Sequence, residues 1–142
     1  MLFRSKDEGQ RDALRALILD KADIVFQNLR PGLIDKFGLD AKSLRAAKPS
    51  LIYANMGAFG AVGPMKEKPG YDPLMQAFGG IMSITGEPGG PPVRAGVSFL
   101  DLSTGILCAL GVCAALIQRE RTGLGQRVNG SLLETEIGRA HV

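Results

Sequence analysis

The chain has 142 residues, of which 45% are hydrophobic and 22% charged. This length and balance fit one soluble globular domain and exclude a disordered or fibrous chain. The net charge of +3 is too small to argue for a nucleic-acid-binding face, which needs a clustered patch, but it is compatible with a small phosphorylated ligand. Cys108 and Cys113 lie in an apolar run, which argues against a disulfide scaffold and a zinc site and favours a cytoplasmic location.

No segment of the sequence predicts a signal peptide or a membrane span. Charged residues follow Met1 with no apolar core behind them. The longest apolar run, residues 105–117, is 13 residues long, whereas a bilayer span needs about 20. We therefore expect a buried helix here, in which both cysteines pack, and neither a membrane nor a nucleic acid as partner.

The first half of the chain predicts alternating helices and strands. The expected elements are a helix over 8–21, a buried parallel-type strand over 22–27, a short helix over 32–37 closed by Gly38, a helix over 40–47 capped by Asp40, and a strand over 50–54. This order is typical of an open α/β sheet.

The second half combines loops rich in Gly and Pro with one long helix. We expect a long loop from Asn55, a helix over 71–77 ended by Gly79-Gly80, a turn-rich loop over 87–92, a helix from Asp101 to about Arg121, and a strand over 126–133. Long ordered loops tend to carry function. Asn129-Gly130 departs from the apolar pattern of a strand, so the sequence leaves the pairing of the last strand open.

Asp101 is the first candidate for chemistry, because it opens the long helix. One reading makes it an N-cap, whose carboxylate accepts backbone N–H bonds. The other reading makes the same oriented carboxylate a covalent nucleophile toward an activated acyl group. The two roles are compatible, and spacing alone favours the cap.

Two further segments are candidates for ligand binding. Asn28, Leu29 and Arg30 follow a strand at its carboxyl end, where open α/β sheets bind ligands. Their exposed amides, with Arg30 and Lys36, could meet a phosphorylated nucleotide, and a solvated basic turn is an equal reading. The second segment, Lys68-Pro69-Gly70-Tyr71-Asp72, is either a turn before a helix or a cradle for a thioester or phosphate arm. No nicotinamide or P-loop motif occurs in the sequence.

Several stretches together resemble the family III CoA-transferases, the formyl-CoA transferase and carnitine dehydratase (CaiB/BaiF) group. The resemblance runs from about Leu2 to Thr135. It is carried by ADIVFQNLRPG (22–32), GYDPLMQAFGGIMSITGEPGGPPVRAG (70–96), DLSTG (101–105) and RTGLGQRV (121–128). The implied fold is part of an open, mostly parallel Rossmann-like sheet with flanking helices, ending in a long helix and a strand.

The resemblance implies exchange of coenzyme A between an acyl-CoA and a carboxylic acid, with no metal. By resemblance, Asp101 attacks the donor thioester, and the reaction passes through an aspartyl anhydride and an aspartyl-CoA thioester. The implied CoA contacts are Asn28, Leu29, Arg30, Lys36, the segment Lys68 to Asp72, and Arg4. The stretch from 80 to 96 resembles members that act on dicarboxylates such as succinate or glutarate.

Two alternatives stay open beside the transferase. Racemases of this fold carry His where this chain has Tyr71, and Tyr is poorly matched to proton transfer near neutral pH, so we prefer the transferase. The other alternative is a non-catalytic CoA-binding or partner subunit.

The resemblance also implies a longer protein. Family members are about three times longer and form interlocked homodimers, so we expect residues 1–135 to be a fragment of the large domain. EIGRAHV (136–142) back-translates to a common sequencing-library adapter, which predicts a non-native tail containing His141, the single histidine. We expect the 142-residue chain alone to be poorly stable and inactive.

Overall fold

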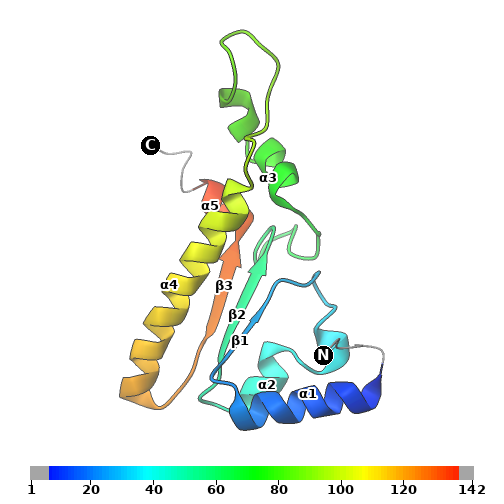
Figure 1. Cartoon of the computed structure of the whole chain (residues 1–142), viewed down its shortest axis with the longest axis vertical. Helices are drawn as coiled ribbons and strands as arrows, with labels where there is room; N and C mark the ends of the chain where they lie inside the picture. Colours follow the sequence, from blue (N-terminus) through cyan, green and yellow to red (C-terminus); the bar gives the residue numbers. More distant parts are fainter. Residues whose placement is uncertain (1–6, 138–142) are drawn as a thin grey trace.

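A parallel sheet of three strands forms the centre of the computed structural model, which describes residues 7–137 (Figure 1). The strand order is β1 (Ile24–Gln27), β2 (Ile52–Gly57), β3 (Arg127–Ser131). In register, Val25 lies beside Tyr53 and Tyr53 beside Arg127. Because side chains alternate along a strand, these three share one face of the sheet. The predicted α/β fold with a parallel sheet is confirmed.

Helices α1 (Glu8–Lys21) and α2 (Ala41–Ala47) cover that face of the sheet. Each helix starts at an aspartate N-cap, a residue type that favours this position. Asp7 accepts from the Gln10 N–H at 3.2 Å, and Asp40 accepts from the Ser43 N–H at 2.9 Å. The short 3₁₀ helix η1 (Asp35–Phe37) ends at Gly38, whose φ of 64° suits glycine. These predicted elements are confirmed.

Tyr53 is the centre of the core beneath α1 and α2. Its ring is buried with Leu39, Leu44 and Leu51, and its hydroxyl donates to the Leu39 carbonyl oxygen at 2.9 Å. Burial raises the pKa of Tyr53 to about 12. The hydroxyl therefore stays protonated and keeps donating to the Leu39 carbonyl oxygen, since a buried phenol needs a hydrogen-bond partner.

Helix α4 (Phe99–Thr122) covers the opposite face and lies unusually close to β3. A Cβ at Gly111 would be 2.8 Å from the Val128 side chain, and a Cβ at Gly130 would be 2.2 Å from Cys108 Sγ. Gly130 therefore interrupts the apolar pattern of β3 because the helix needs its space. The strand nevertheless pairs fully with β2, which settles the pairing that the sequence left open.

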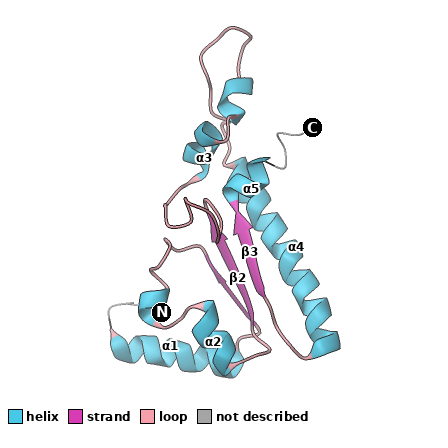
Figure 2. Ribbon diagram, turned by 180° about the vertical axis from the view of Figure 1, so that it is seen from behind, coloured by secondary structure: helices cyan, strands magenta, loops and turns pink. Residues whose placement is uncertain are grey.

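Two helices lie at the carboxyl ends of the strands (Figure 2). These are α3 (Asp72–Phe78) and α5 (Leu132–Ile137), and the 3₁₀ helix η2 (Ile81–Ile84) follows α3. Ala58, Met75, Leu100 and Leu132 form a second buried cluster that joins α3, α4 and α5 to the end of β2. Neither η2 nor α5 was expected from the sequence.

Three burial expectations are wrong in part. β1 was expected to be buried, but Ile24 and Phe26 are exposed, because they lie on the α4 face of the sheet and α4 packs mainly on β2 and β3. The long helix is buried on one stripe only: Ile106 is 69% exposed, and other large apolar residues on the same surface are Leu102, Leu107, Leu110 and Ile117. Cys108 is buried as expected, but Cys113 is exposed.

The predicted division at residue 135 falls inside α5, since Glu136 and Ile137 continue that helix. Glu136 is fully buried; its Oε1 accepts from the Ile81 N–H at 3.3 Å, and its Oε2 has no partner. Burial raises its pKa, and the nearby charge of Asp72 adds to that shift. Residues 138–142 lie outside the described part of the chain, and the non-native origin of 136–142 stays a prediction.

Two glycines of α4 give a matched test of its packing. Gly105→Ala meets no atom within 4 Å, so it should raise the free energy of unfolding by about 1 kcal/mol through helix propensity. Gly111→Ala gains the same propensity but collides with Val128, which should cost about 1–3 kcal/mol. Urea denaturation of the two variants, made in chains of the same length, compares their free energies of unfolding. Equal free energies of unfolding would show that α4 does not lie this close to β3.

Candidate active site

A cavity of about 360 Å³ lies at the carboxyl ends of β1 and β2. Its walls come from the segment after β1, the start of α2, the end of β2 and the loop that follows β2. Carboxyl ends of parallel strands are where open α/β sheets bind ligands. The sequence placed a ligand site at the segment after β1, and the cavity lies there.

Gln27 and Asn55 shape the floor of this cavity. They are paired in register, Gln27 as the last residue of β1 and Asn55 two residues before the end of β2, and the Gln27 amide donates to the Asn55 side chain. Gln27 Oε1 accepts from the Leu29 N–H at 2.7 Å. The sequence analysis expected exposed amides in this turn, but the N–H of Leu29 is already occupied.

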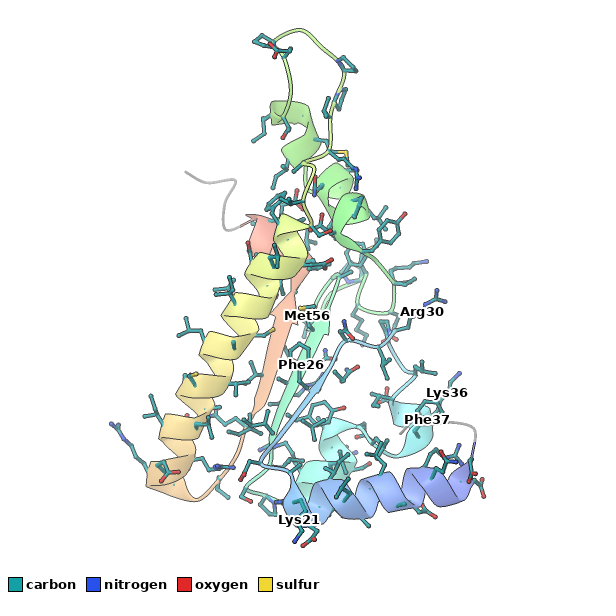
Figure 3. All side chains as sticks on the ribbon, in the orientation of Figure 1. Lys21, Phe26, Arg30, Lys36, Phe37 and Met56 are labelled. Atoms are coloured by element: carbon teal, nitrogen blue, oxygen red, sulfur yellow. The ribbon has the colours of Figure 1, made fainter. Side chains whose placement is uncertain are left out.

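Basic side chains border the cavity. Leu29 and Arg30 line it, whereas Asn28 and Lys36 are exposed and do not line it. Figure 3 places Arg30 and Lys36 on the same side of the molecule, along the segment that follows β1. Sequence reasoning missed the further cations in the lining, which come from three separate elements: Lys42, Lys66 and Arg127. The lining also contains three acids, Asp35, Asp40 and Glu67.

The segment Lys68 to Asp72 lies beyond this cavity and does not line it. The side chains of Lys68 and Pro69 are exposed, and that of Tyr71 is 64% exposed. Gly70 packs so closely on the end of β2 that a Cβ there would be 2.5 Å from the Ala58 Cβ. The segment therefore runs from the cavity loop to the start of α3, with Tyr71 facing solvent.

Asp101 lies in the first turn of α4 and does not cap it. The helix begins two residues earlier, at Phe99, and Ser98 occupies the N-cap position without a side-chain hydrogen bond. The carboxylate of Asp101 is partly exposed. Its pKa is raised from the usual 3.8, first because burial disfavours the charge and second because the Asp72 carboxylate is near. The N-cap reading of Asp101 is wrong, because another residue binds the free N–H groups.

That residue is Asp72, the first residue of α3. Its carboxylate Oδ2 accepts from the backbone N–H groups of Leu100 at 2.7 Å and Asp101 at 3.1 Å. Asp72 is 1% exposed, so its carboxylate is surrounded by protein. The family resemblance implied that Asp72 contacts CoA, whereas its side chain binds the start of α4.

The arrangement therefore has two parts, a polar cavity with basic residues at its border and an acidic helix start, joined by the loop over 58–71. Arg4, the remaining predicted contact, lies outside the described residues. Among residues 7–137 no group of three His, Cys, Asp or Glu side chains is placed to hold a metal ion. Within the same range α4 is long and apolar enough to cross a membrane, a test that core helices also pass.

Comparison with known proteins shows which family this chain resembles. Residues 3–139 match CoA-transferase family III. The chain is 42% identical to acetyl-CoA:oxalate CoA-transferase of Acetobacter aceti, over 94% of this chain and 34% of the relative. It is also 42% identical to succinate–glutarate CoA-transferase of Agrobacterium fabrum, over 87% of this chain and 31% of the relative.

Solved structures agree with the computed fold. A CaiB/BaiF family protein from Brucella suis superposes with a TM-score of 0.89 at 41% identity, covering 95% of this chain and 35% of that protein. The chain thus spans about a third of the length of the proteins that it matches. With most of its length matching the family and its fold shared with a solved CaiB/BaiF protein, this chain belongs to CoA-transferase family III.

Proposed function

We propose that the full-length protein carrying this chain transfers CoA from an acyl-CoA to a carboxylic acid, with Asp101 as the covalent nucleophile. The observation that carries the proposal is the partly exposed carboxylate of Asp101 in the first turn of α4. Its raised pKa supports this role, because nucleophilicity rises with basicity. Membership in the family supports CoA as the exchanged group.

The proposed chemistry divides the exchange into acyl transfers on one carboxylate. Asp101 Oδ attacks the donor carbonyl, the C–S bond breaks, and CoA leaves as a thiolate from an aspartyl anhydride. The thiolate attacks the aspartyl carbonyl and releases the donor acid, which leaves an aspartyl-CoA thioester. The acceptor carboxylate then repeats these two steps in reverse, which forms the new acyl-CoA and frees Asp101.

The binding part of the proposal assigns the nucleotide half of CoA to the region after β1. Arg30 and Lys36 supply positive charge for phosphates, and Asn28 and Leu29 form the turn between them and the strand. The pantetheine arm runs along Lys68, Pro69, Gly70 and Tyr71 toward Asp101. Exposed positions at Lys68, Pro69 and Tyr71 support this path.

The acceptor in this proposal is a small dicarboxylate. Relatives at 42% identity are named for oxalate and for succinate and glutarate. A racemase reading is less well supported, because the position beside Asp72 holds Tyr71, whose phenol is a poor acid and base at neutral pH. We further propose that the full-length protein is a cytoplasmic homodimer; the exposed apolar residues along α4 support further packing against it.

Substituting Asp101 tests the nucleophile. In the full-length protein, Asp101→Ala should lower transfer at least about 10⁴-fold, because the covalent route is lost, while CoA binding survives. The measurement is acyl exchange by chromatography together with CoA binding by calorimetry. Transfer that persists at near the normal rate would show that Asp101 is structural only. Deuterium uptake at the α-carbon without acyl exchange would support a racemase.

The same position gives a stability prediction. A raised pKa means that ionised Asp101 destabilises the fold at neutral pH, and that this cost disappears once the group is protonated in both states, below about 3.8. Asp101→Asn should therefore raise the free energy of unfolding at pH 7, by an amount that fades as the pH falls toward 3.8. Urea denaturation across this range measures it, with exposed Asp12→Asn as the net-charge control. A loss of stability at pH 7 would mean that the helix N-terminus favours the charge more strongly.

Arg30 tests the phosphate contact. Arg30→Ala should raise KM for acyl-CoA about tenfold with little change in kcat, because a charge-assisted bond to a phosphate is lost far from the reacting carbonyl. Lys21→Ala removes an exposed cation at the end of α1, which among the described residues is paired only with its exposed neighbour Asp20 and lies away from the cavity, and is the matched control (Figure 3). Equal KM values for the two variants would remove Arg30 from the site.

A further inference from the structure

We propose that Asp72 is a positioning residue, which fixes the nucleophilic carboxylate of Asp101 through the backbone at the start of α4. This inference rests on the proposed role of Asp101 and adds to it. The sequence suggested only that Asp72 contacts the ligand, whereas its side chain is buried and directed at the helix.

The first step of the argument is the missing cap. The first N–H groups of any helix lack partners within the helix, and in most helices a side chain at the N-cap binds one of them. Ser98 holds that position in α4 but makes no such bond. Asp72, 29 residues before Asp101 in the chain, binds the N–H groups of Leu100 and Asp101 instead. These two bonds therefore fix the position of the start of α4 relative to α3.

The second step is that Asp72 is itself held in place. The Gln76 amide Nε2, one turn along α3, donates to the other carboxylate oxygen, Asp72 Oδ1. Gln76 Oε1 accepts from the Ala95 N–H at 2.8 Å, so the same side chain ties down the loop that leads into α4. Asp72 and Gln76 are each 1% exposed. Charged and amide groups at such burial keep these bonds, because breaking one leaves a polar group unpaired.

The third step links this network to the chemistry. One of the two N–H groups bound by Asp72 belongs to Asp101 itself, so the bond fixes the backbone from which the nucleophilic side chain extends. Attack on a thioester needs the carboxylate within a few tenths of an ångström of its productive position, and a displacement of about 1 Å can lower the rate about 10²-fold. The substrate need not touch Asp72 for this effect.

The test is a polarity exchange within the pair, made in the full-length protein. Asp72→Asn keeps one acceptor oxygen for the N–H groups of α4, but it turns an NH₂ group toward the NH₂ of Gln76. Adding Gln76→Glu restores every bond: the introduced amide donates to the introduced carboxylate, whose other oxygen still accepts from Ala95. Ser131→Ala is the control for the loss of a buried cap: its hydroxyl accepts from the Glu134 N–H at the start of α5 and donates to the Ala58 carbonyl oxygen.

We expect Asp72→Asn to lower kcat about 10²-fold, with KM for acyl-CoA changed less than about threefold. The double variant should recover kcat to within about tenfold of the unsubstituted protein, and Ser131→Ala should leave kcat unchanged. Thermal unfolding of each variant separates rate from stability: kcat is compared well below every melting temperature, where all variants are folded and a purely structural loss would leave kcat near normal.

Two results would overturn the inference. The first is a kcat for Asp72→Asn equal to that of Ser131→Ala. The second is a folded double variant whose kcat stays 10²-fold low. If Asp72→Asn alone does not fold, the double variant still decides between recovery and loss. Asp101→Ala in the same assay separates the two proposals: if it retains transfer, the proposed function fails and the positioning role fails with it, whereas an inactive Asp101→Ala beside a normal Asp72→Asn removes Asp72 alone.

Discussion

Parallel pairing of β2 with both of its neighbours is the constraint on which the rest of the structure depends. It brings three carboxyl ends to one edge of the sheet, so loops that leave at residues 27, 57 and 131 start beside one another. The cavity after β1, the loop after β2 and helix α5 after β3 are consequences of that edge. The buried residues Ile52, Tyr53 and Ala54 make β2 the strand against which both helical layers pack.

The helical layers differ in how complete they are. α1 and α2 pack on a core around Tyr53 and Leu44, whereas α4 buries one stripe and leaves a broad apolar surface uncovered. Surfaces of this kind usually mark contact with further protein. This agrees with relatives about three times as long as the chain, in which more polypeptide is present to pack on such surfaces.

Sequence reasoning worked where the determinants are local. Asp40 and Gly38 mark the ends of their elements within a few residues, so the helices around them were predicted closely. It failed where the determinant is distant in the chain. The start of α4 was misplaced because its cap is Asp72, and Gly130 looked wrong for a strand because the reason for it, Cys108, is on a helix. A ligand-binding segment was predicted at the carboxyl end of β1, but Lys42, Lys66 and Arg127 were missed because only the tertiary fold brings them to the cavity there.

The contact of α4 with β3 also limits how the molecule can move. Gly111 against Val128, and Gly130 against Cys108, leave no slack for the helix to slide or roll across the strand. The same contact restrains the height of Asp101, at the start of this helix, above the sheet. The loop over 58–71, whose residues 61–69 are mostly exposed, has no such restraint along most of its length. If the proposed thioester exchange takes place here, the exposed loop rather than the tightly packed helix is the part that can move to admit the substrate.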